Sequence, residues 1–154
     1  MKASLSFTWT LSGAGWADCV VADADAEAQM LVSYISPAPE ELIGAVTRLA
    51  LGESGDHKVK FEAEPNGFLW HLSPDGDAVE IRVVESPDTS RRSRPGTVSW
   101  EARHPIEAPA RCVPRGLDRV HADRGEDGWY ADWRRPFPRR ELEQLRGVRV
   151  KLRA

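Results

Sequence analysis

The sequence lacks the features of a membrane or secreted protein. Its 154 residues contain no apolar run near the length of about 18 residues that marks a membrane-spanning helix. The N-terminal segment has one lysine and then alternating polar and apolar residues, without the apolar centre of a signal peptide. We therefore expect a cytoplasmic protein without membrane association.

Cysteine is scarce, and Cys19 and Cys112 lie far apart in the sequence. Neither belongs to a CxxC pair, so we expect free thiols in a reducing compartment and no structural disulfide. Arg111 and Arg115 flank Cys112 and could lower its pKa, as in a reactive thiol. A half-buried structural thiol is the favoured interpretation.

Motifs for cofactors and catalysis are also missing. Gly13-Ala14-Gly15 begins like a dinucleotide fingerprint but lacks the third glycine, and a strand rather than a helix is predicted after it. The spacing of His104 and His121 assembles no Ser-His-Asp or Cys-His arrangement. The sequence thus predicts no cofactor and no metal, and it favours a protein that is not an enzyme.

What is present is a strand-rich first half. Apolar residues alternate with polar ones in 4–11, where Leu5, Phe7, Trp9 and Leu11 face inward, and two more strands are predicted at 16–22 and 26–36. A helix over 40–52 follows the third strand, with acidic residues in its first turn and apolar residues at helical spacing.

A meander is predicted next, from two hairpin turns. Asn66-Gly67 and Asp75-Gly76 predict strands near 57–64, 67–74 and 77–86. With two-residue turns, Ala63 pairs with Trp70, Phe61 with Leu72, and Trp70 with Ile81. Both turns place the same residues on the inner face.

The remainder is predicted to be a flexible polar loop at 86–95, a strand at 97–104 and then helices. Val98, Trp100 and Ala102 are expected to face inward. Val113, Leu117 and Val120 form one helical stripe, Trp129 and Trp133 another, and a last helix, 139–146, should end at Gly147. We predict a single α+β domain over 1–154. Its antiparallel sheet has about six to seven strands, with one helix after the third strand and two to three C-terminal helices covering one face.

The predicted register places three polar residues in one row on the outer face of the meander. Glu62 lies opposite His71, and His71 lies opposite Glu80. Such a row could perform acid–base chemistry, hold a metal or bind a ligand, and it predicts a raised pKa for His71. A solvated row of charges is the favoured interpretation, because Lys58, Lys60 and Arg82 lie nearby.

Two other patterns have competing interpretations. One is the alternation of Asp23, Asp25 and Glu27, whose carboxylate oxygens are the ligands that hard cations prefer. The longer ligand series of a calcium loop is missing, so a charged turn is favoured. The tryptophans could line a ligand cavity, but Trp9, Trp70 and Trp100 fall on inner faces, which favours the core.

Charge is split along the chain. Residues 1–90 carry a net charge of −10, and residues 91–154 carry +7. Arg139 and Arg140 begin a predicted helix, where the helix dipole disfavours cations, so we consider them binding candidates. The favoured interpretation is internal pairing of the basic helices with the acidic sheet.

These patterns favour a non-catalytic binding or regulatory protein that recognises a partner macromolecule, most simply a protein, through a charged surface. One alternative is a small-molecule-binding protein or enzyme with a pocket between the sheet and the C-terminal helices. Another is nucleic-acid binding through the basic C-terminal region, although the pI of about 5.8 is low for that class.

Overall fold

The computed structural model describes residues 4–63, 66–87 and 96–153, and the strands in this part of the chain form two antiparallel sheets. One sheet has the order β1 (Ser6–Gly13), β2 (Trp16–Ala22), β3 (Glu27–Ser33). The other has the order β4 (His57–Glu62), β5 (Gly67–Asp75), β6 (Ala78–Ser86), β7 (Thr97–Pro105). The prediction of one continuous sheet is therefore wrong. A helix separates β3 from β4 in the chain, and these two strands do not pair.

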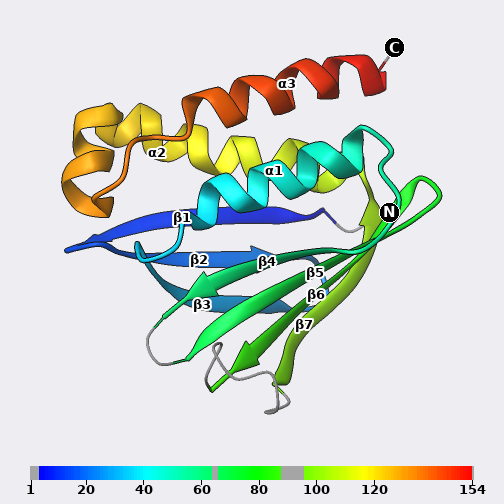
Figure 1. Cartoon of the computed structure of the whole chain (residues 1–154), viewed down its shortest axis with the longest axis horizontal. Helices are drawn as coiled ribbons and strands as arrows, with labels where there is room; N and C mark the ends of the chain where they lie inside the picture. Colours follow the sequence, from blue (N-terminus) through cyan, green and yellow to red (C-terminus); the bar gives the residue numbers. More distant parts are fainter. Residues whose placement is uncertain (1–3, 64–65, 88–95, 154) are drawn as a thin grey trace.

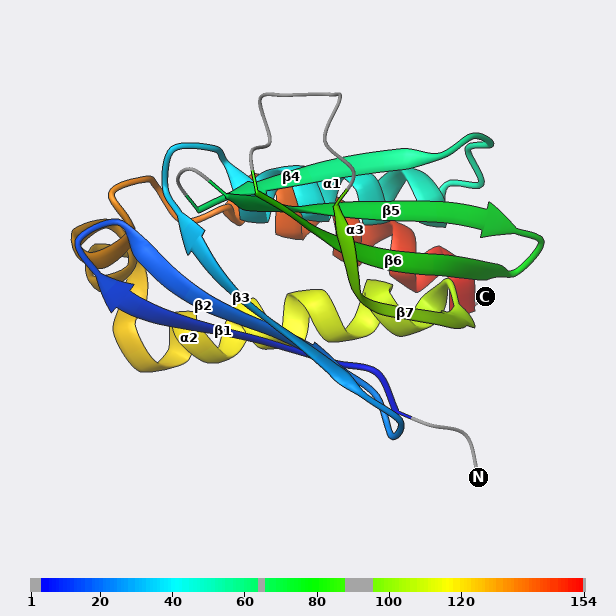
Figure 2. The same cartoon turned by 90° about the horizontal axis from the view of Figure 1, so that it is seen from below.

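The helices lie together on one side of both sheets (Figures 1 and 2). α1 (Ala38–Ala50) follows the third strand, and α2 (Glu107–Trp133) and α3 (Arg139–Arg153) follow the last one. This order confirms the predicted α+β class, the helix after the third strand and the C-terminal helices. Apolar residues from both sheets and all three helices form one buried core.

α2 consists of two helical segments joined at Gly125, which has a left-handed φ of 69°. The two predicted helical stripes lie on either side of this kink. The first segment packs against β1 so closely that a Cβ added to Gly116 would lie 2.3 Å from the carbonyl oxygen of Phe7. α3 continues through Gly147, which corrects the predicted helix end. Leu142 and Leu145 are buried and hold the helix in place, so one exposed glycine is tolerated.

Large aromatic side chains fill the centre of the core. The ring of Trp9 lies 5.2 Å from Trp133 and 6.1 Å from Trp129, so both indoles of α2 pack on β1. Phe61 contacts Trp9 from the other sheet at 6.2 Å and Trp70 at 5.4 Å. These contacts support the core interpretation of Trp9 and Trp70, and Trp100 is also buried.

The meander exists, but its register differs from the prediction. Phe61 pairs with Phe68, and Val59 rather than Ala63 pairs with Trp70. The reason is the connection between β4 and β5, which spans residues 63–66: the amide of Ala63 donates to the carbonyl of Asn66 at 2.9 Å. The loop is thus two residues longer than a tight turn. Because the register moves by an even number of residues, the predicted inner face is kept.

The second turn is displaced as well, and β7 contains a bulge. Asp75 pairs with Ala78, so Gly76 and Asp77 form the turn, and Trp70 lies opposite Val83 instead of Ile81. Between β6 and β7 the register shifts at Val83/Val84. The extra residue in β7 turns Val98 outward, with 48% of its surface exposed, so the prediction of an inward Val98 is wrong. Residues 88–95 of the predicted flexible loop lie outside the described residues.

Candidate functional site

A buried polar contact joins the two sheets at one end of the core. The Nε2 of His104 on β7 donates to the Oδ2 of Asp23, which follows β2, at 3.1 Å, and both side chains are 7% exposed. The other carboxylate oxygen of Asp23 accepts from the backbone amides of Asp25 and Ala26. The indole of Trp100, also on β7, donates to the carbonyl of Ala26. The hydrogen bonds of His104 and Trp100 therefore hold the turn between β2 and β3 against β7.

This pair determines the protonation state of Asp23. Burial acts to raise the pKa of Asp23, but the hydrogen bonds from His104 and the two amides outweigh it, and the pKa lies below the ordinary value. The Asp23, Asp25 and Glu27 series therefore forms a turn held by His104, as the charged-turn interpretation requires. Within residues 4–63, 66–87 and 96–153, no group of three His, Cys, Asp or Glu residues could hold a metal ion.

The structure separates the three residues of the predicted Glu62–His71–Glu80 row. His71 lies opposite Lys58 on β4 and Arg82 on β6, while Glu62 lies opposite Gly67. Glu80 lies opposite Ser73 and Arg103 instead. The physical causes are the longer connection between β4 and β5 and the displacement of the β5–β6 turn by one residue.

The electrostatics of His71 change accordingly. Partial burial, Lys58 and Arg82 all disfavour the imidazolium, so the pKa of His71 is lowered rather than raised. The expectation of a raised pKa was wrong. The structure gives no support for a carboxylate–imidazole–carboxylate group at this position.

The two thiols are buried and free. Burial raises the pKa of Cys112 to about 12, and the effect of Arg115 in the opposite direction is too small to offset it. The pKa of Cys19 is raised well above its ordinary value, also by burial. Both thiols are therefore protonated at neutral pH, which agrees with structural rather than nucleophilic cysteines.

The basic residues of the C-terminal helices find acidic partners mostly within those helices. Arg124 pairs with Asp132, Arg139 with Glu126, and Arg146 with Asp118. Internal pairing was predicted, but with the acidic sheet as partner. The packing of α3 beside α2 brings α2 carboxylates within reach instead (Figure 1). Arg140 is exposed beside Arg139.

The outer face of the β1–β3 sheet carries two acidic residues, Asp18 and Glu27, and the described residues of these strands include neither Lys nor Arg. The strands β1–β3 turn their outer side chains to solvent as cross-strand rows, such as Thr10–Asp18–Leu31 and Thr8–Val20–Gln29. We call this surface the hydroxyl face. Its members are Ser6, Thr8, Thr10, Ser12, Asp18, Val20, Glu27, Gln29 and Leu31.

Two large apolar side chains are exposed on or beside this face. Leu31 on β3 is 48% exposed, and Ile35, in the connection to α1, is 47% exposed. The backbone that carries Ile35 is held in place, because Arg135 donates to the carbonyls of Tyr34 and Ile35. One edge of the hydroxyl face is therefore apolar, and the backbone at Ile35 is held in place by Arg135.

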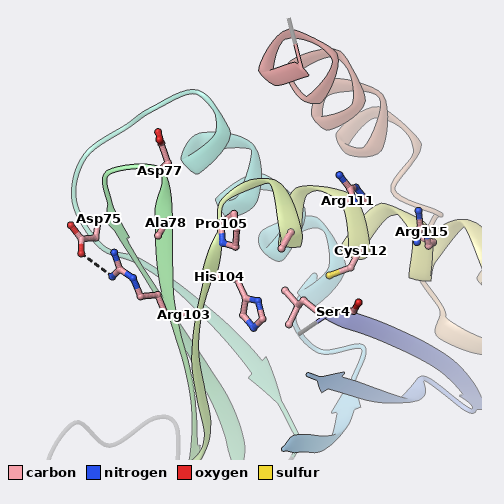
Figure 3. Close-up of a pocket in the computed structure, with 12 residues that line it drawn as sticks. Ser4, Asp75, Asp77, Ala78, Arg103, His104, Pro105, Arg111, Cys112 and Arg115 are labelled. Atoms are coloured by element: carbon pink, nitrogen blue, oxygen red, sulfur yellow. Dashed lines mark hydrogen bonds and ion pairs between the residues drawn. The ribbon is translucent and has the colours of Figure 1, made fainter. Parts of the chain in front are cut away.

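A cleft lies at the junction of β7 and α2 (Figure 3). This cleft has a volume of about 760 Å³. It is lined from three directions: by the residues before β1, by the β5–β6 turn with the end of β7, and by the first turns of α2. His104 lies in its wall. One alternative from the sequence had a pocket between the sheet and the C-terminal helices, but no lining residue was assigned to it. The inward parity of Trp100 and Ala102 also places His104 on the inner face.

Comparisons with known proteins give no relative from which a function can be transferred. No family model, curated protein or solved structure matches the chain. In the part of the chain that the structure describes, the helices are too short or too polar to cross a membrane. The surfaces described above are therefore the basis for a functional proposal.

Proposed function

We propose that this chain is a non-catalytic binding protein that recognises a basic partner protein through the hydroxyl face. The observation that carries the proposal is the combination of Leu31, exposed on a sheet, with Asp18 and Glu27 on a face whose nine described members include neither Lys nor Arg. Exposed apolar side chains with polar surroundings are typical of protein interfaces. The carboxylates of Asp18 and Glu27 would attract a positively charged partner to this surface.

The charge of the hydroxyl face distinguishes among macromolecular partners. Asp18 and Glu27 repel phosphate, so a nucleic acid or an anionic membrane is disfavoured there. Ser12 donates to the Oδ2 of Asp18 at 2.9 Å, and Gln29 donates to Glu27 at 2.8 Å, which fixes both carboxylates in place. Carboxylates held in this way can accept hydrogen bonds from Lys or Arg side chains at a small entropic cost.

The other sites among the described residues have side chains that are mostly buried or already paired. The buried thiols are protonated, and the imidazole of His104 is engaged by Asp23. Of the two arginines that were binding candidates, Arg139 is paired with Glu126 of α2, whereas Arg140 is exposed. The hydroxyl face is therefore the stronger candidate for macromolecular recognition.

The test begins with capture of proteins from a lysate of the source cells on the immobilised full chain. Each captured protein is then purified, and its Kd is measured for three forms: the unchanged chain, Leu31→Lys and Val98→Lys. Val98 is a matched control because it is also 48% exposed but lies on the other sheet. A basic protein should bind the Leu31→Lys form at least about tenfold more weakly, a loss of about 1.4 kcal/mol, and the Val98→Lys form unchanged.

Salt dependence provides the second readout. The affinity of a basic partner should fall as salt rises, because salt screens the attraction between exposed charges. Equal binding to the Leu31→Lys and unchanged forms by every captured protein would overturn the proposal. So would a partner whose affinity is lost only in an Arg139→Gln/Arg140→Gln form, since that would place recognition on the C-terminal helices.

A further inference from the structure

The cleft at the β7–α2 junction has a different character from the hydroxyl face, and it requires a different ligand. Much of its interior is apolar or uncharged: Leu5, Ala78, Pro105 and Ala108 line it together with the protonated thiol of Cys112. The imidazole of His104 is already bonded to Asp23, so it offers little to recruit a charged ligand. Such a surface suits an apolar body.

The cleft has cations on two of its walls: Arg103 on β7, and Arg111 and Arg115 on α2. Arg111 and Arg115 are four residues apart on α2, so they project from the same side of the helix one turn apart. Arg111 pairs with Glu107 at 2.8 Å. Within the described residues, Arg115 is exposed and forms no ion pair within 4.0 Å, so its guanidinium is available to a ligand.

The carboxylate of Asp75 at the opposite wall is engaged by Arg103 and not by Arg115. Arg103 bridges Asp75 at 2.8 Å and Glu80 at 3.1 Å, so the two carboxylates share one guanidinium. Asp77 also lines the cleft, and its carboxylate points away from His104 (Figure 3). The cleft therefore combines an apolar interior with one available cation at its α2 wall.

We propose that the cleft binds a small amphipathic carboxylate, with its apolar body against Leu5, Pro105 and Ala108 and its carboxylate on Arg115. A guanidinium donates two parallel hydrogen bonds to a carboxylate, which gives both affinity and orientation. The size of the cleft lies within the range of about 300–1,000 Å³ that is common for small-molecule sites. This ligand site is independent of the partner protein proposed above.

The test uses octanoate as the carboxylate probe and octanol as its neutral counterpart, with binding to the full chain measured by calorimetry. Octanoate should bind at one site and more tightly than octanol. Arg115→Gln should weaken octanoate about tenfold and leave octanol unchanged, because only the carboxylate uses the guanidinium. Arg119→Gln is the matched control: it is exposed on the next turn of α2 and does not line the cleft.

A second variant tests the apolar part of the site. Ala108→Phe should reduce the affinity for both probes by filling the cleft, and its melting temperature would show whether the fold is kept. The proposal is overturned if neither probe binds at millimolar concentration, if octanoate and octanol bind equally, or if Arg115→Gln and Arg119→Gln have the same effect. None of these outcomes bears on the partner protein, whose surface is the hydroxyl face.

Discussion

The imidazole of His104 on β7 and the carboxylate of Asp23 after β2 form a buried hydrogen bond of 3.1 Å between residues 81 positions apart in the chain. This contact links the two sheets, which belong to separate hydrogen-bonded ladders. A buried hydrogen bond with a charged acceptor contributes more to stability than one between neutral groups. The pair is therefore a suitable place to test how the two sheets are held together.

Replacing Asp23 with Asn should destabilise the protein by about 1.5–3 kcal/mol at pH 7, the range for hydrogen bonds to charged groups. The folded pKa of Asp23 is lowered, so its stabilising effect is present above the unfolded pKa of about 3.9. It is lost as the pH falls through the folded value. Urea denaturation at pH 7 and at lower pH measures both effects. Asp25→Asn, an exposed neighbour in the same turn, should change little, and equal losses in the two variants would contradict the prediction.

Replacing Glu40 with Gln should raise the melting temperature at pH 7. Burial raises the pKa of Glu40, Glu141 adds to the effect, and the Oε1 of Glu40 is buried without a hydrogen-bond partner. A raised folded pKa means that the ionised form destabilises the fold, and that this penalty disappears as pH falls through the folded value. The gain should therefore vanish under acidic conditions. Glu41→Gln, in the same helical turn but exposed, should show no gain.

The imidazole of His71 should titrate below the ordinary histidine value of about 6.5. Its partial burial and its cross-strand neighbours Lys58 and Arg82 all disfavour the charged form. An NMR titration of the ring protons gives the pKa directly. Lys58→Gln should raise that value, whereas Lys60→Gln, two positions along the strand from Lys58, should have a smaller effect. A pKa at or above 6.5 in the unchanged chain would refute the observed register.

Replacing Gly116 with Ala should lower the melting temperature, because the new methyl group would meet the carbonyl oxygen of Phe7, which is backbone and cannot rotate away. To relieve this clash, α2 would have to move away from β1. Gly147→Ala is the matched control, since nothing lies within 4 Å of a Cβ there. That change should stabilise α3 by about 0.5–1 kcal/mol. Thermal unfolding of both variants measures the two effects, and a stabilised Gly116→Ala form would contradict the packing described.

The corrected meander shows how far local sequence signals reach. Alternation with period two correctly placed Trp70 and Phe61 in the core. The face to which a strand residue points depends only on whether its position in the strand is odd or even. The pairing of Phe61 with Phe68 depends on the length of the connection after β4, which Asn66-Gly67 alone did not determine. Val98 was misplaced because a bulge breaks parity, and bulges arise from pairing with a neighbouring strand.

The sequence by itself determined the succession of strands along the chain, the helix after β3, the C-terminal helices and the inner faces apart from that of Val98, because these follow from hydrophobic period and from proline and glycine positions. Only the tertiary structure decided that the strands divide into two sheets and that His104 meets Asp23. It also decided that Arg111 and Arg115 border a cleft with the end of β7. Each of these features joins segments distant in the chain, and such contacts depend on how whole elements pack rather than on the preferences of neighbouring residues.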